Sequence, residues 1–309
     1  MVQVALFYPI IAIGAFAISS AMIKDLDRIG SPIYLNFLRA TTGAVMFLLV
    51  IMINSSFSQV LELSPLILLY LVLSVFFNVV MGDTLYFYSQ NTLGVKIATP
   101  IVNIYPFVTV LFSYLFLEES LSSDFYIGGV LIIGGVIILS QDVDENHHSD
   151  IDLHQHKRKV IIALIAAIGA NICYALGVIL ITVGSEGIDV NVANAVRMPA
   201  ASILLAFGVF SQYKFHTEGN PKIIKVQPRE MSKKDIIKII LTGLLGTYLA
   251  SYFLVLGTQK LGAGPTAILL STGPLFSLPI AIFWLKEKLG WLTVIGTTLS
   301  ISGLLIIIV

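Results

Sequence analysis

The chain carries an internal repeat that spans most of its length. The segment PFVTVLFSYLFLEE at 106–119 is echoed by PLFSLPIAIFWLKE at 274–287, a separation of 168 positions. Earlier in each half, NFLR at 36–39 returns as NAVR at 194–197, now 158 positions apart. The difference between the two separations fits a longer polar loop in the second half, around 211–236. The chain therefore consists of two related halves.

The composition is that of a membrane protein. Of the 309 residues, 57% are hydrophobic and only 12% are charged, whereas about a quarter of the residues in ordinary globular chains are charged. Apolar segments long enough to cross hydrocarbon as helices recur from end to end. A net charge of zero excludes whole-chain attraction to nucleic acid. The single cysteine, Cys173, excludes an internal disulfide.

We predict an all-α polytopic membrane protein with ten transmembrane helices. The predicted spans are 4–23, 33–53, 66–92, 97–117, 124–140, 159–184, 190–212, 236–260, 264–285 and 290–309. Five spans in each half place the halves in opposite orientations, and such inverted repeats are typical of secondary transporters. The predicted domains are a first five-helix repeat at 1–140 and a second at 159–309, joined by a polar linker at 141–158.

The distribution of Lys and Arg predicts how the helices are oriented. The loops on one side, which include the linker and the loop at 214–235, hold 15 basic residues by our count, whereas the side with both termini holds only Lys260. The positive-inside rule therefore places the linker and the loop at 214–235 in the cytoplasm, in a cell membrane, with both termini outside.

Several short motifs are weak alone but become fairly specific in their order. They are FLRA at 37–40, NTLG at 91–94, Pro106, LEE at 117–119, and the glycine pairs at 128–129 and 134–135. In this order, and partly duplicated over 194–303, they resemble the drug/metabolite transporter superfamily, in the branch with two EamA-type domains. The resemblance covers essentially the whole chain.

This resemblance implies a ten-helix bundle with a central cavity that carries metabolites by alternating access. Relatives handle amino acids, sugars, nucleotide conjugates and drugs, in export or import. The chain departs from the family at 13–16, where IGAF stands in place of the Trp-Gly that the family often has. The usual family orientation has both termini in the cytoplasm, opposite to the charge distribution, which leaves the direction of transport open.

Asp83 is the carboxylate predicted to lie deepest within a span. Its counterpart at the 168 separation is Ser251, so it breaks the repeat. A charged group at this depth costs about 3 kcal/mol or more and usually marks a pathway, a coupling site or a buried pair. A lone buried carboxylate suits carrying a proton or meeting a cation. The structural alternative is an Asp bonded to Asn78, Arg39 or a tyrosine.

Arg39 and Arg197 occupy equivalent places in the two halves, each three residues after an asparagine. This spacing puts Asn36 and Arg39 on one helix face. Two guanidinium groups in a central site would suit an anionic or carboxylated solute. The structural alternative is that each arginine snorkels to the interface or binds carbonyl groups near a helix end.

Aromatic and small polar residues recur along the spans that carry these charged groups. Such a mixture suits a cavity wall that combines ring surfaces with a few hydrogen-bonding groups, although many such residues serve only helix packing. The further residues that we predict to contact solute are Asn78, Tyr86, Asn103, Tyr174, Tyr248, Tyr252 and Ser271.

Pro106 and Pro274 each remove a backbone hydrogen bond within a predicted span, so we predict hinges or static bends there. Glu119 and Glu287 end their spans and are candidate gate residues. The linker holds His147, His148, His154 and His156, but their spacing matches no tight zinc pattern. We therefore predict no metal site and no cofactor.

The function that these features favour is secondary-active transport of a small organic metabolite. The chain has no nucleotide-binding motif, so a gradient or exchange must drive transport, and coupling to protons would run through Asp83. Amino acids satisfy both the arginines and Asp83 and are favoured as solutes. The alternatives are export of drugs or organic cations, transport of nucleotide sugars or phosphorylated solutes, and, remotely, a membrane-embedded lipid-modifying enzyme. The expected partners are the solute, the lipid bilayer and a coupling proton or ion, with a homodimer left open.

Overall fold

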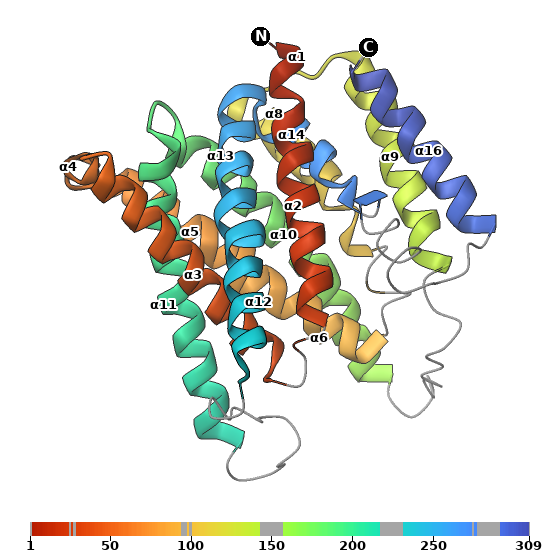
Figure 1. Cartoon of the computed structure of the whole chain (residues 1–309). Helices are drawn as coiled ribbons and strands as arrows, with labels where there is room; N and C mark the ends of the chain where they lie inside the picture. Colours follow the sequence, from red (N-terminus) through yellow and green to blue (C-terminus); the bar gives the residue numbers. More distant parts are fainter. Residues whose placement is uncertain are drawn as a thin grey trace.

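The computed structural model of the chain is an all-helical bundle (Figure 1). It describes residues 2–24, 26, 29–93, 98, 101–142, 157–216, 231–273, 275–276 and 291–308. The helices of the first half are α1 (Val2–Ala5), α2 (Phe7–Lys24), α3 (Pro32–Ile53), α4 (Phe57–Leu61), α5 (Pro65–Val75), η1 (Phe76–Gly82), α6 (Asp83–Leu93), α8 (Tyr105–Leu117) and α9 (Ser123–Asp142). Those of the second half are α10 (Lys157–Ser185), α11 (Val190–His216), α12 (Lys233–Gly243), η3 (Leu244–Leu249), α13 (Ala250–Leu261), α14 (Ala263–Leu270) and α16 (Trp291–Ile308).

Local sequence signals set where the helices begin. Ser31 and Ser64 each cap a helix through the side-chain oxygen and precede a proline at the first helical position, where the missing proline N–H costs nothing. Ser232 and Asp235 form a reciprocal capping box at the start of α12, which satisfies two otherwise unpaired backbone donors.

Length and composition mark several of these helices as membrane-spanning. Within the described ranges, five helices are long and apolar enough to cross a bilayer. They cover Ile33–Ile53, Pro65–Tyr86, Lys159–Ser185, Val190–Ser211 and Lys233–Leu261. Shorter apolar helices cover Gln3–Ser19, Tyr105–Leu117, Ser123–Ile138 and Val294–Ile308. These stretches follow the predicted spans, and the structure has the fold of a membrane protein.

The helices at Pro65–Tyr86 and Lys233–Leu261 each contain a π-helical segment. It is η1, between α5 and α6, in the first and η3, between α12 and α13, in the second. Phe76 begins η1 and Leu244 begins η3, which is the 168 separation already seen in the sequence. The predicted spans four and nine are also interrupted at matching places. A turn at Asn103 and Ile104 precedes α8, and a turn at Ser271 and Thr272 follows α14. The sequence repeat is thus accompanied by a repeat of the π-helical segments and of the turns at the same separation.

Glycines allow α9 and α16 to pack closely, side by side at one edge of the bundle (Figure 1). A Cβ atom at Gly128 would lie 2.6 Å from the carbonyl oxygen of Gly303, so neither helix tolerates a side chain at this crossing. The two chain termini are found at the same end of the bundle (Figure 1).

Candidate functional site

Asp83 is the first residue of α6, directly after η1 ends. Tyr174 of α10 donates a hydrogen bond from its hydroxyl to Asp83 Oδ1, with an oxygen–oxygen distance of 2.7 Å. Gly82 permits this approach, because a Cβ atom there would lie 2.7 Å from the Tyr174 ring. A π-helical turn next to a carboxylate is a combination that often marks a functional site.

Arg39 is the nearest basic partner of this carboxylate. Its side chain is only 8% exposed, and it interacts electrostatically with Asp83. Nη1 donates to Asn36 Oδ1 at 3.4 Å, and the guanidinium lies over the Phe16 ring at 5.3 Å from its centroid. Nε is buried without a hydrogen-bond partner. An unsatisfied buried donor of this kind is costly, and a ligand with an acceptor group would remove that cost.

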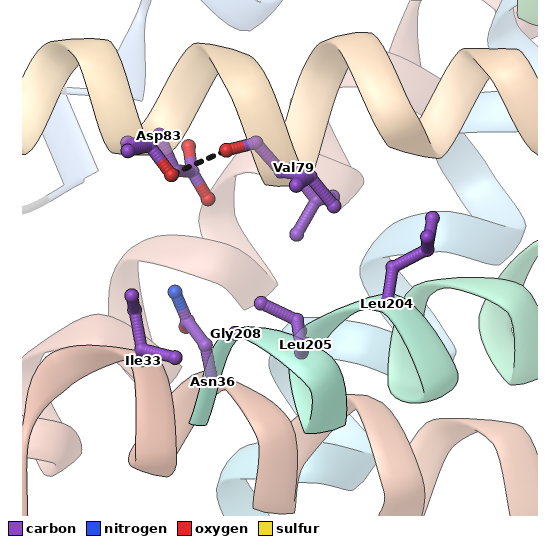
Figure 2. A pocket seen from close by; sticks show the side chains of 9 residues that line it. Ile33, Asn36, Val79, Asp83, Leu204, Leu205 and Gly208 are labelled. Carbon is purple, nitrogen blue, oxygen red and sulfur yellow. Dashed lines mark hydrogen bonds between the residues drawn. The ribbon is translucent and has the colours of Figure 1, made fainter. Parts of the chain in front are cut away.

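A small cavity of about 40 Å³ separates Asp83 from α3 and α11 (Figure 2). The side chain of Asn36 points from α3 toward Asp83 across this space. The remaining lining is largely apolar and consists of Ile33, Val79, Val80, Thr84, Leu204, Leu205 and Gly208. Thr84 donates its hydroxyl to the Val80 carbonyl (the dashed line in Figure 2). A cavity of this volume holds a few water molecules and is smaller than a site for a whole metabolite.

Aromatic rings surround the far side of Asp83. The Tyr105 ring meets the Tyr174 ring edge-on, with centroids 5.8 Å apart, and the Tyr86 hydroxyl also lies close enough to interact with Tyr174. Asn78 packs one turn away, where a Cβ atom at Gly177 would lie 2.8 Å from the Asn78 Cβ. The half-buried Asn103 lies in the turn just before α8. Of the predicted solute contacts, Asn36 and Asp83 line the cavity, whereas Tyr174 and Arg39 interact with Asp83 through a hydrogen bond and through electrostatics.

Arg197 has a different environment from Arg39. It is 2% exposed. Its Nε donates to Ser74 Oγ at 3.0 Å and its Nη1 to Asn194 Oδ1 at 2.8 Å. Asn194 donates in turn to the carbonyl of Ser251 at 3.3 Å. These bonds join α11 to α5 and α13. Arg197 itself binds side-chain oxygens, whereas the structural alternative predicted from the sequence was snorkelling or binding of carbonyl groups.

Tyr248, Tyr252 and Ser271, like Arg39 and Tyr174, are not among the residues that line the cavity. The Tyr248 ring packs against Phe47 of α3 with centroids 4.6 Å apart, and Tyr252 packs edge-on against Phe253. Ser271 is buried in the turn after α14 and donates its hydroxyl to the Ile268 carbonyl of that helix. Pro106 lies in the first turn of α8, and Pro274 lies outside the described residues.

Glu119 binds the beginning of a helix. Its carboxylate accepts hydrogen bonds from the backbone N–H groups of Ala263 at 2.8 Å and Gly264 at 3.0 Å. A carboxylate in this place satisfies unpaired donors and complements the helix dipole of α14. Glu287, the counterpart in the second half, lies outside the described residues, as do the four histidines of the linker.

Sequence reasoning missed the apolar wall that α11 contributes. Leu204, Leu205 and Gly208 line the cavity, yet none carries a polar group that would mark it within an apolar helix. The one available signal was the repeat, because Gly208 stands where the first half has Val50, at the 158 separation. Glycine has no side chain, so its presence at a position that holds valine in the other half leaves the volume of that side chain unfilled.

Known transporters match parts of the chain in sequence. The uncharacterized transporter YdfC of Bacillus subtilis is 32% identical over 84 residues, which make up 27% of this chain and 28% of that protein. An uncharacterized transporter of Clostridium kluyveri is 30% identical over 86 residues, 28% of each chain. The uncharacterized transporter YetK of B. subtilis is 29% identical over 122 residues, 40% of this chain and 33% of that protein. The matches thus span about a third or less of the length of these curated relatives.

A solved protein structure and a protein family match nearly the whole chain. The crystal structure superimposes with a TM-score of 0.75 at 14% sequence identity, covering 99% of this chain and 96% of that one. This likeness concerns the fold alone. The EamA-like transporter family matches residues 3–141 and again 161–309. The chain therefore belongs to the EamA-like transporter family of the drug/metabolite transporter superfamily, and it is a multi-pass membrane protein.

Proposed function

We propose that the protein is a secondary-active carrier of a small organic solute, built from ten transmembrane helices in two inverted repeats. The repeats are 1–140 and 159–309, and the polar segment 141–158 links them. The matching positions of η1 and η3, and of the turns beside α8 and α14, support this division. Alternating access then requires the two halves to move relative to one another around a central site.

The Asp83 cavity is the observation that carries the proposal. A carboxylate in the middle of an apolar bundle is expensive to bury, and here it borders open space as well as a phenol and an arginine. A group so placed binds either a proton or a cationic solute. Competition between the two at one carboxylate couples solute movement to the proton gradient.

Amino acids or related solutes are the favoured class. Asp83 and Asn36 offer acceptors for an ammonium group, and Arg39 has a buried donor without a partner that suits a carboxylate. Arg39 thus joins the solute site, whereas Arg197 is already occupied by Ser74 and Asn194. This occupation weighs against nucleotide sugars and phosphorylated solutes, which would draw on both arginines.

Export of organic cations is the second candidate function. The observation that favours it is the lining of the cavity, where one carboxylate faces the apolar side chains of Ile33, Leu204 and Leu205 (Figure 2). A solute with an ammonium group and an apolar body would match this lining without any contact to Arg39. Arg39→Ala then separates the two candidates, because it impairs transport of amino acids and leaves transport of simple amines unchanged.

The cavity is near one end of the bundle. Ile33 and Asn36 belong to the first turns of α3, and Gly208 lies in the last third of α11, at the end opposite the chain termini (Figure 1). The positive-inside rule assigns this end, with the loop at 214–235 and the linker, to the cytoplasm. We propose that the site is reached from there. Pro106 and Pro274 are the proposed hinges beside the broken helices.

Transport by the reconstituted protein tests this function. Liposomes with an imposed pH gradient are assayed for uptake of radiolabelled amino acids and amines. We expect Asp83→Asn to abolish gradient-driven accumulation while it spares solute exchange. The amide oxygen still accepts a hydrogen bond, but the amide group does not take up and release a proton. Asp124→Asn is the matched control, since it makes the same change at an exposed carboxylate in the first turn of α9, away from the cavity. Undiminished accumulation in Asp83→Asn would refute coupling through this residue.

A further inference from the structure

Each residue around the Asp83 cavity has a counterpart in the other half of the chain. The 158 separation pairs α3 with α11, and the 168 separation pairs η1 and α6 with η3 and α13. By these separations the polar residues Asn36 and Asp83 correspond to Asn194 and Ser251, and Gly208 corresponds to Val50. The same rule locates a second site, related to the cavity by the symmetry of the repeat.

Larger side chains occupy this second site. Three lining residues of the cavity have an aromatic counterpart, and the pairs are Val80 with Tyr248, Thr84 with Tyr252, and Leu205 with Phe47. We call Phe47, Tyr248 and Tyr252 the aromatic cluster. The two halves therefore differ in side-chain size at the positions that line the cavity, with the smaller side chains around the cavity and the aromatic ones at the second site.

The structure shows these aromatic residues packed together. Phe47 is fully buried, and its ring centroid is 4.6 Å from that of Tyr248. Tyr248 and Tyr252 pack against the same apolar core of α3 and α11 residues. Asn194 bonds directly to the carbonyl of Ser251, whereas its counterpart Asn36 faces Asp83 across the cavity (Figure 2). The second site is thus filled where the first is open.

The two sites lie toward opposite ends of the bundle. The cavity takes Ile33 and Asn36 from the beginning of α3 and Leu204, Leu205 and Gly208 from the middle and last third of α11. Phe47, in contrast, lies in the last third of α3, and Asn194 lies near the start of α11. These latter segments lie toward the end that bears both chain termini (Figure 1). With the cavity end assigned to the cytoplasm as proposed above, the second site lies toward the outer side of the membrane.

We propose that the aromatic cluster is the closed half of the solute path, which opens toward the side of the termini as the Asp83 cavity closes. The inference rests on the proposed carrier function. Alternating access in inverted repeats moves one half against the other, and we take the arrangement of each half as the template for the second conformation of the other. The open site would then be lined by Asn194, Ser251 and the tyrosines. A solute ammonium group held by Asp83 on one side meets only the neutral Ser251 on the other, which favours its release.

Reporter cysteines test this proposal without any need to know the solute. In a Cys173→Ala background, Gly208→Cys reports the open cavity and Val50→Cys reports its counterpart. Each single-cysteine protein is placed in nanodiscs, where a membrane-impermeant maleimide reaches both faces, and the labelling rate is measured. We expect Gly208→Cys to react at least about tenfold faster than Val50→Cys, because only its site is open.

Removal of one ring supplies the decisive comparison. Added to each reporter, Phe47→Ala should raise the labelling rate of Val50→Cys and lower that of Gly208→Cys, because opening one site closes the other. Phe112→Ala, which deletes a ring in α8 outside both sites, is the control and should change neither rate. Tyr248→Leu replaces Phe47→Ala if the latter does not fold, since it keeps an apolar side chain in the core.

The outcomes separate this inference from the proposed transport function. A faster Val50→Cys reaction with an unchanged Gly208→Cys reaction would mean a local void only, and would overturn the proposal. Reciprocal rates support it. Because labelling needs neither solute nor a pH gradient, loss of coupling through Asp83 would leave these rates as they are.

Discussion

Arg39 and Arg197 show how the same residue in the same motif takes two roles. Both are buried and both donate Nη1 to the asparagine three residues earlier. Arg197 Nε binds Ser74, but Arg39 Nε has no partner. The two arginines also pack across the halves. Arg197 reaches Ser74 beside η1, and a Cβ atom at Gly246 of η3 would lie 2.6 Å from Arg39 Nη2.

This difference predicts opposite effects of removing each side chain. Arg197→Ala should destabilise the protein by about 2 kcal/mol or more, because it deletes two hydrogen bonds from a charged donor and leaves a cavity. Arg39→Ala should cost much less stability but weaken binding of carboxylated solutes. Thermal unfolding of the detergent-purified proteins and solute binding to each give the two measurements. An Arg39→Ala protein with full affinity for amino acids would return Arg39 to a structural role.

The sequence predicted some of these residues better than others. Asp83, Arg39 and Asn36 were found because a charge or amide within an apolar span is conspicuous, and the structure groups them. Tyr248 and Tyr252 also combine a ring with a hydroxyl group within an apolar span. However, they pack against Phe47 and the apolar core around it, and they do not line the Asp83 cavity. Composition along one helix cannot show which neighbouring helix a side chain faces, since that depends on packing between distant segments.

At the scale of elements, the broken helices were the least predictable. Spans four and nine read as continuous apolar segments, yet turns interrupt them at Asn103 and at Ser271. The prolines predicted an irregularity in each, and Pro106 stands at the start of α8. The first N–H groups of a helix have no hydrogen-bond partner within that helix, so a proline in the first turn costs no bond. Pro106 therefore lies at the beginning of α8 and does not kink it.

The carboxylate of Glu119 compensates for one of these interruptions. It accepts hydrogen bonds from two backbone N–H groups at the start of α14. We expect Glu119→Ala to lower stability by about 1 kcal/mol, the usual cost of losing a helix cap. Thermal unfolding in detergent measures the effect, and the neighbouring Glu118→Ala is the matched control. Equal unfolding temperatures for the two variants would show that the cap contributes nothing.

At the scale of the whole molecule, the repeat predicted more than any single motif. It indicated two halves and paired positions, and the structure repeats its π-helices and its turns at the same separation. The cavity could not be predicted in this way, because it arises where the halves differ. Asp83, Gly208 and Thr84 depart from their counterparts Ser251, Val50 and Tyr252. The departures from symmetry therefore coincide with the proposed site, whereas the symmetry predicts the fold.

Gly208 provides the clearest test of whether solute passes through this cavity. A Cβ atom there would meet only Ile33 Cγ2, at an ordinary contact distance of 3.7 Å, so a side chain extends into open space and does not disturb the fold. Gly208→Val should therefore fill the cavity and make this half resemble its counterpart, which has Val50. We expect transport to fall by about tenfold or more, with little change in the unfolding temperature.

Gly134→Val provides the control for this prediction. Gly134 lies in α9, and a Cβ atom there would meet nothing within 4 Å, so the same side chain is added away from the cavity. Solute uptake into liposomes and thermal unfolding are measured for both variants. Because a carrier must open to both sides in each cycle, closure of one half is enough to stop transport. Full uptake by Gly208→Val would show instead that the solute crosses the bundle by a route that avoids Asp83.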